Sequence, residues 1–213
     1  MVEEFGRANS LLRKAQLQAL LHNHIAVHWV PPPEGWIKIN SDGSRNTCTS
    51  MSTCRGVGRD SNSSWCFSFA KDIGICSCLE AKLWGIYEGL ATAWSLRYTR
   101  VLLETDNRKA YDTVLNRNLR NVGSSIISSI FEILSRQWEV RFSFIRREGN
   151  RVADAMACLV LLGFLDHCRW MDPPLAVQDI VLMDGSHTIP SDIANTSNMG
   201  SSPHPDYDVT GDT

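Results

Sequence analysis

The sequence predicts an α/β fold in which one mixed sheet of five strands carries packed helices. The first observation is the alternation of apolar and polar residues over 36–42 and 64–71, which is typical of strands. The second is the helical spacing of apolar residues over 79–96, which predicts a long amphipathic helix. The third is the order of the elements. Three strands precede alternating helices and strands, so we expect a three-strand antiparallel meander followed by two parallel strands.

The individual elements follow from local patterns. The first strand should stop at Gly43, a turn residue, and a polar turn over 60–63 joins the second strand to the third. Gly56 and Gly58 weaken the second strand. The buried face of the long helix is expected to comprise Leu79, Leu83, Ile86, Leu90 and Ala93. The expected strands cover 36–42, 51–59, 64–71, 100–105 and 139–145, and the expected helices cover 79–96, 107–115, 124–136 and 151–162.

Composition divides the chain into four parts. Residues 1–33 form an N-terminal helical linker that ends in a stiff proline spacer. Residues 34–165 form the folded domain, and 166–183 a C-terminal extension. From Asp184 the chain is rich in Ser, Asp, Pro, Thr, Asn and Gly, which predicts a disordered tail over 184–213.

Charge and cysteine content limit the function classes. The net charge is -2, which neither indicates nor excludes a nucleic-acid partner. The seven cysteines include no C-x-x-C pair, and no apolar run approaches the ~20 residues of a membrane span. We therefore expect a reduced, intracellular monomer with free thiols and no membrane partner, and its compartment, nucleus or cytoplasm, stays open. The histidines at 22, 24 and 28 have no matching cysteine pair, which disfavours zinc.

Four acidic residues form the candidate catalytic centre. Asp42 and Asp106 each close an expected strand, and Glu80 and Asp154 each lie in the first turn of an expected helix. If the first and fourth strands are parallel neighbours, their carboxyl ends place Asp42 and Asp106 side by side. Because like charges raise one another's pKa, four converging acids favour a bound divalent cation.

Mg²⁺ suits such oxygen ligands, with Mn²⁺ as an alternative. Two ions together would activate a water and stabilise the leaving oxygen of a phosphodiester. The ordinary alternative stays open, because acids also stabilise helix N-termini and commonly follow strands in loops.

Several short motifs occur in a fixed order. They are Trp36-Ile37-Lys38-Ile39-Asn40, Ser41-Asp42-Gly43-Ser44, Leu79-Glu80-Ala81, Glu104-Thr105-Asp106-Asn107, and Arg147-Glu148-Gly149-Asn150-Arg151-Val152-Ala153-Asp154. From about Trp29 to Gly163, this ordered set resembles the RNase H-like domain of plant retrotransposon-type reverse transcriptases, within the ribonuclease H superfamily.

The resemblance implies a ribonuclease H fold and a two-metal nuclease that cuts the RNA strand of an RNA–DNA hybrid. In that family four acids are catalytic and hold the metal ions, and Asp42, Glu80, Asp106 and Asp154 stand at their positions. Nucleic-acid contacts are implied for Ser44, Asn107, Arg147 and Asn150. The expected partner is an RNA–DNA hybrid or a structured nucleic acid, recognised by shape and 2′-hydroxyl contacts.

Two departures from the family pattern bear on activity. The second strand looks a few residues short, and Phe144 stands where related nucleases often carry a histidine. We expect Phe144 to be a core aromatic of an alternating strand and turnover to be slow. An alternative function is an RNase H-like binding module with little or no activity. A more distant one is a phosphatase with Asp42 as nucleophile, although the second aspartate typical of such enzymes is absent two residues on.

Overall fold

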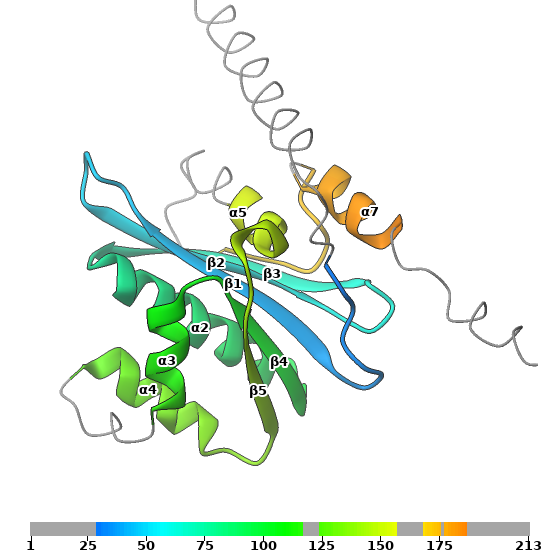
Figure 1. Ribbon diagram of the computed structural model, residues 1–213, viewed down its shortest axis with the longest axis horizontal. Helices are drawn as coiled ribbons and strands as arrows, with labels where there is room; N and C mark the ends of the chain where they lie inside the picture. Colours follow the sequence, from blue (N-terminus) through cyan, green and yellow to red (C-terminus); the bar gives the residue numbers. More distant parts are fainter. Residues whose placement is uncertain (1–28, 117–123, 157–167, 176, 187–213) are drawn as a thin grey trace, which may run out of the picture.

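The described residues form one mixed sheet with helices on both of its faces (Figure 1). This computed structural model describes residues 29–116, 124–156, 168–175 and 177–186. The strands are β1 (Ile37–Arg45), β2 (Met51–Arg59), β3 (Trp65–Ile75), β4 (Arg100–Thr105), β5 (Glu139–Phe144) and β6 (Cys168–Trp170), in the spatial order β5-β4-β1-β2-β3-β6. Neighbours β5, β4 and β1 are parallel, whereas β1, β2, β3 and β6 pair antiparallel. The expected fold class is confirmed.

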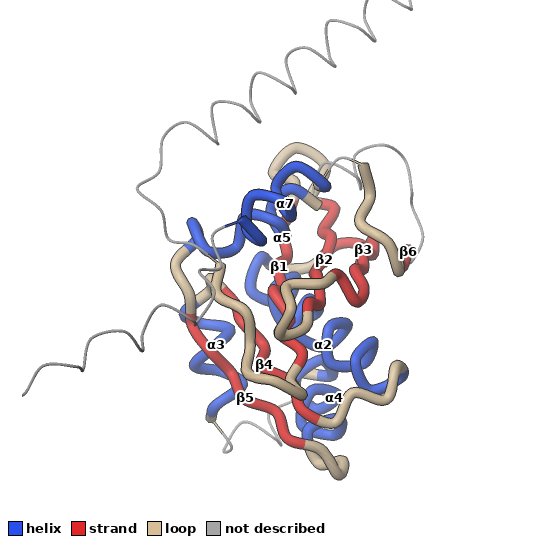
Figure 2. The backbone as a smooth tube through the Cα atoms, turned by 90° about the vertical axis from the view of Figure 1, so that its right-hand side faces the viewer, coloured by secondary structure: helices blue, strands red, loops and turns tan. Residues whose placement is uncertain are grey.

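The helices pack on the sheet in two groups, one on each face (Figure 2). They are α2 (Cys78–Ser95), α3 (Arg108–Leu115), α4 (Ser125–Leu134), α5 (Arg151–Ala155) and α7 (Gln178–Ser186), and a 3-10 turn, η2 (Arg147–Asn150), precedes α5. The larger core lies between the sheet and α2, α3 and α4, and it includes Ile37, Ile39, Phe67, Phe69, Leu83, Ile86, Leu90 and Leu103. A smaller core joins α5 and α7 to the other face through Val57, Val152, Met156, Val177 and Ile180.

The structure differs from the expected elements near the C-terminus. It has a sixth strand among the described residues, because β6 pairs with β3 from inside the segment expected to be an extension. Helix α7 runs to Ser186, so it includes the first three residues of the segment expected to be disordered. The helix expected over 151–162 is described only as far as 156, and the helical linker expected over 1–28 lies outside the described residues. No described helix is long and apolar enough to cross a membrane.

Two glycines in β2 leave room for buried aromatic rings. A Cβ at Gly56 would lie 2.6 Å from the Phe69 ring, and one at Gly58 would lie 2.6 Å from the Phe67 ring. Both rings are fully buried, so they cross the strand where no side chain stands in the way. The strand has nine residues and pairs with β1 and β3, so it forms along its expected length with both glycines in place.

Helix α2 lies unusually close to β1, and this contact places the candidate site. A Cβ at Gly43 would lie 2.1 Å from the Ala81 carbonyl oxygen, and one at Gly85 would lie 2.5 Å from the Asp42 carbonyl oxygen. Contacts below 3.0 Å with backbone atoms require a shift of the chain. Glycine at both positions therefore allows the first turns of α2 to rest against the end of β1, beside Asp42.

Gly85→Ala is expected to destabilise the protein by about 1–3 kcal/mol, as overpacking does. Alanine normally stabilises a helix interior relative to glycine by about 1 kcal/mol, but here the new methyl group meets the backbone of Asp42. Gly89→Ala, in the same helix, is the matched control. Its Cβ would meet first the Ile39 side chain at 3.1 Å, which has more freedom to adjust. Urea denaturation of both variants measures the difference, and equal stabilities would contradict the close packing.

Candidate carboxylate centre

Two aspartates, one in β1 and one directly after β4, meet at the carboxyl end of β4. The expectation that β1 stops at Gly43 is wrong, because the strand pairs with β2 as far as Arg45 and Asp42 lies within it. Strands β1 and β4 are parallel neighbours with Ser41 opposite Thr105, so the next residues, Asp42 and Asp106, emerge side by side. The expected juxtaposition of these two acids is confirmed. It follows from the parallel register alone, because the carboxyl ends of such strands share one edge of the sheet.

Asp154 joins them from α5. Val152 and Met156 bury this helix against Val57 of β2, and the first turn of α5 faces the end of β1. One carboxylate oxygen from each of Asp42, Asp106 and Asp154 lies within 4.8 Å of the others. Divalent cations prefer such oxygen ligands, so the three side chains form a candidate metal site.

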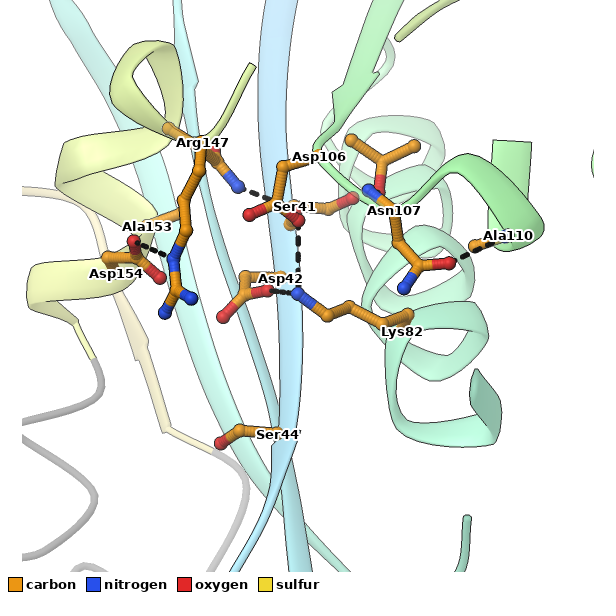
Figure 3. A network of polar contacts seen from close by, with 12 residues as sticks. Ser41, Asp42, Ser44, Lys82, Asp106, Asn107, Ala110, Arg147, Ala153 and Asp154 are labelled. Atoms are coloured by element: carbon orange, nitrogen blue, oxygen red, sulfur yellow. Dashed lines mark hydrogen bonds and ion pairs between the residues drawn. The ribbon is translucent and has the colours of Figure 1, made fainter. Parts of the chain in front are cut away.

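A lysine ammonium lies inside this group of acids (Figure 3). Lys82 Nζ donates to Asp42 Oδ1 and, at 3.0 Å, to Asp106 Oδ1, and its side chain is only 14% exposed. Burial lowers the pKa of Lys82, but Asp42 and Asp106 outweigh it, so the pKa lies above its ordinary value. Lys82 therefore stays protonated at neutral pH and bridges the two aspartates. The sequence interpretation missed this residue.

The structure does not bring Glu80 to the other three acids. Glu80 is exposed, and its carboxylate accepts a hydrogen bond from the Ser77 N–H at 2.9 Å, while the Ser77 hydroxyl accepts from the Glu80 N–H at 3.1 Å. This pair is a capping box that starts α2. Because a helix turns by about 100° per residue, position 82 reaches the acids and position 80 faces away. Four acids were expected to meet here. Among the described residues, the site instead contains three acids, Asp42, Asp106 and Asp154, and the lysine Lys82.

Glu80→Gln is expected to remove part of the acid sensitivity of the fold and leave the site intact. The Ser77 N–H lowers the pKa of Glu80 below its ordinary 4.5, so the charged carboxylate stabilises the folded state above that pH. This contribution is lost as the pH falls through the lowered value. Thermal unfolding between pH 3 and pH 7 should show a stability difference of no more than about 1 kcal/mol at neutral pH, disappearing in acid. A difference that persists at the lowest pH would contradict this role.

Arg55 forms a second internal cation of the site. Its guanidinium pairs with Asp42 Oδ2, donates from Nε to the Ala153 carbonyl at 2.9 Å, and donates from Nη1 to the Ser44 hydroxyl at 2.8 Å. It also lies 3.8 Å from Asp154 Oδ1. Arg55 therefore connects β1, β2 and α5 and fixes Asp154 relative to Asp42.

Arg147 is the exposed cation of the site. Its Nε lies 3.3 Å from Asp154 Oδ2, and its side chain is 78% exposed. Burial and the nearby charge of Asp42 raise the pKa of Asp154, and Arg147 and Arg55 only partly offset this. Arg147 is thus the cation of this site that faces solvent, and its contact with nucleic acid stays a prediction.

The other residues implied for nucleic-acid contact, Asn107, Asn150 and Ser44, make hydrogen bonds within the protein. The Asn107 side chain accepts from the Ala110 N–H at 2.8 Å and caps α3. Asn150 does not cap α5 with its side chain. It is 1% exposed and donates to the Ser41 carbonyl at 3.2 Å, which ties η2 to β1. Ser44 is half-buried and bonded to Arg55.

Phe144 is not the core residue that the alternation of β5 predicted. It is 39% exposed, and its ring lies 6.2 Å from that of Tyr111, with the Arg108 guanidinium over it. The strand lies at the edge of the sheet, where both faces of its last residues reach solvent.

Comparison with known proteins identifies the domain. The family model described as reverse transcriptase-like matches residues 40–160, which is more than half of the chain. The chain belongs to the reverse transcriptase-like family of RNase H domains. It is 34% identical, over 136 residues, to the Arabidopsis thaliana protein named "Putative ribonuclease H protein At1g65750". That match covers 62% of this chain and 21% of the relative, so the chain spans about a fifth of that protein's length.

Solved structures share the fold of this RNase H domain. RNase H1 of the archaeon Halobacterium salinarum is 14% identical with a TM-score of 0.50, covering 56% of this chain and 92% of that one. The N-terminal RNase H domain of a Mycobacterium tuberculosis protein is 18% identical with a TM-score of 0.51, covering 60% and 97%. At these identities the likeness concerns the fold alone.

The residues of this RNase H domain fit a divalent cation by ligand type but not by charge. Both oxygens of Asp42 already accept from Lys82 and Arg55, and Asp106 shares Lys82. A pair of metal ions at these oxygens would have to displace the part-buried ammonium of Lys82 and the buried guanidinium of Arg55. As arranged, the centre is therefore neutralised by the chain itself.

Proposed function

We propose that this RNase H-like domain binds nucleic acid and that it prefers RNA–DNA hybrids. The binding site lies at the sheet edge formed by β1, the end of β4 and the start of α5. The observation that carries the proposal is the meeting, at one edge, of Asp42, Asp106 and Asp154 with Lys82, Arg55 and the exposed Arg147. Family membership supports the ligand class. Such a duplex is recognised through its shape, its phosphates and its 2′-hydroxyls.

Fluorescence anisotropy with a short labelled hybrid tests this proposal, with a DNA duplex of the same sequence as reference. We expect tighter binding of the hybrid, and a fall in affinity with salt because phosphate contacts release counterions. Arg147→Ala should weaken binding and reduce the salt slope by about 1. Arg97→Ala removes another exposed arginine, just beyond the far end of α2, and should leave the slope unchanged. Equal behaviour of the two variants would reject binding at this edge.

A second candidate function is metal-dependent hydrolysis of the RNA strand, with Mg²⁺ or Mn²⁺ as cofactor. It is favoured by the three carboxylates that lie within 4.8 Å of one another and is opposed by the cations that already occupy their oxygens. A cleavage assay with each metal, run beside Asp42→Asn, separates the two functions. Cleavage by the native chain alone would establish hydrolysis. Binding without cleavage in either protein identifies a binding module.

A further inference from the structure

Lys82 stands where the site would otherwise need a positive charge from outside the protein. Its ammonium bridges Asp42, within β1, and Asp106, directly after β4. Helix α2 holds it there, because the capping box at Ser77 and the glycine contacts with β1 fix the first two turns of the helix. The side chain is largely buried, so its position is determined by packing as well as by charge.

The charges around Lys82 are balanced within the chain. Asp42, Asp106 and Asp154 carry three negative charges, and Lys82, Arg55 and Arg147 contribute three positive ones through direct contacts. Acids that share a site without such partners repel one another and raise one another's pKa. Here each of the three has a cationic partner in direct contact, so the chain itself compensates their charges.

We infer that Lys82 takes the place of a divalent cation in this site, so that the domain engages the phosphodiester backbone of nucleic acid without metal. The second half of this inference rests on the proposed function. A phosphate that approaches three uncompensated carboxylates is repelled, whereas a phosphate that approaches the neutralised centre is not. Lys82 then keeps Asp42 and Asp106 compensated, and the exposed Arg147 contacts the phosphates of the backbone, as arginine does at other phosphate sites.

The first arm of the test measures metal binding alone, by titrating Mn²⁺ into the full chain and following heat release and the melting temperature. The native protein should show no saturable binding and no rise in melting temperature. Lys82→Glu replaces the cation by a fourth carboxylate and should bind Mn²⁺ saturably, which the native chain should not. It should also melt at a higher temperature with Mn²⁺, because a ligand that binds only the folded state stabilises it.

The second arm measures anisotropy of the labelled hybrid with EDTA and with Mg²⁺ at matched ionic strength. The affinity of the native chain should be the same in both. Lys82→Glu should lose at least about tenfold in EDTA, because its acids face the phosphates without compensation, and should recover with Mg²⁺. Lys109→Glu makes the same change of charge at an exposed position of α3, and any loss there should not depend on metal.

The two arms distinguish failure of the inference about Lys82 from failure of the proposed nucleic-acid binding. Saturable Mn²⁺ binding by the native chain, or loss of its hybrid affinity in EDTA, overturns the inference. If the native chain binds no hybrid in either buffer, the proposed function fails, and the Mn²⁺ titration still decides whether Lys82 excludes the cation. If Lys82→Glu does not fold, Lys82→Met removes the charge with a similar volume. It should then bind hybrid more weakly than the native chain in EDTA, and an unchanged affinity would overturn the inference.

Discussion

Asp184→Asn should destabilise the protein by about 3–5 kcal/mol, the usual cost of removing one partner of a buried ion pair. Asp184 Oδ2 accepts from Arg59 at 2.8 Å, and Asp184 Oδ1 accepts from Arg151 at 2.9 Å. Arg59 is 1% exposed. Its planar guanidinium lies over Trp29, with 3.7 Å between the guanidinium carbon and the centre of the tryptophan ring. Asparagine keeps the shape of the side chain but leaves this guanidinium without a carboxylate partner.

The surroundings of Arg59 offer no adequate replacement for Asp184. Burial lowers the pKa of Arg59, and the charge of Asp184 is the main influence that opposes this. Glu104 also acts on Arg59, but it is paired with Lys38 at 2.9 Å. Because arginine does not give up its proton in proteins, the variant retains the charge of Arg59 in the protein interior. The uncompensated desolvation of this charge lowers the free energy of unfolding.

Urea denaturation measures this loss, and Asp179→Asn is the matched control in the same helix. Asp179 is exposed in the first turn of α7, so its variant should lose no more than about 1 kcal/mol. Adding Arg59→Met to Asp184→Asn removes the unpaired charge and should restore part of the stability. A cost below that of the control would contradict a structural role for the ion pair. Because Arg151 begins α5, the variant should also weaken the placement of Asp154.

The sheet and three of the acids were predictable because they depend on short-range patterns. Period-two alternation located β1 and β3, the apolar run over 101–103 located β4, and the parallel arrangement of β1 and β4 placed Asp42 beside Asp106. Asp154 required only the start of α5. These features follow from strand and helix periods, which the chain carries locally.

The remaining part of the site depends on which residue of α2 turns toward the acids. Both Glu80 and Lys82 lie in the first turns of this helix, and residue type favoured the glutamate. The signal that separates them is Ser77 three residues before Glu80, a capping-box spacing that assigns the glutamate to the helix start. By contrast, Arg55 and Asp184 carry no local signal, because their partners lie far away in the chain.

Replacement of Arg55 by methionine should cost about 3 kcal/mol and disconnect Asp154 from the rest of the site. The guanidinium is almost fully buried, and three groups from two other elements accept its hydrogen bonds or charge: Asp42, Ser44 and the Ala153 carbonyl. Methionine fills a similar length without any donor, so these groups lose a buried partner. The loss should lie at the lower end of the range for buried pairs, because Lys82 still neutralises Asp42.

Arg55→Lys distinguishes the geometry of this contact from its charge. A lysine keeps the positive charge but lacks the planar fork that serves several acceptors at once, so it should recover only part of the stability lost in Arg55→Met. The double variant Arg55→Met with Asp42→Asn should be more stable than the sum of the single changes indicates, because neither buried charge then lacks its partner. Additive effects in urea denaturation would show that the two residues act independently. Coupled effects would mean that the neutral centre is one connected unit, in which Arg55 sets the distance between Asp42 and Asp154.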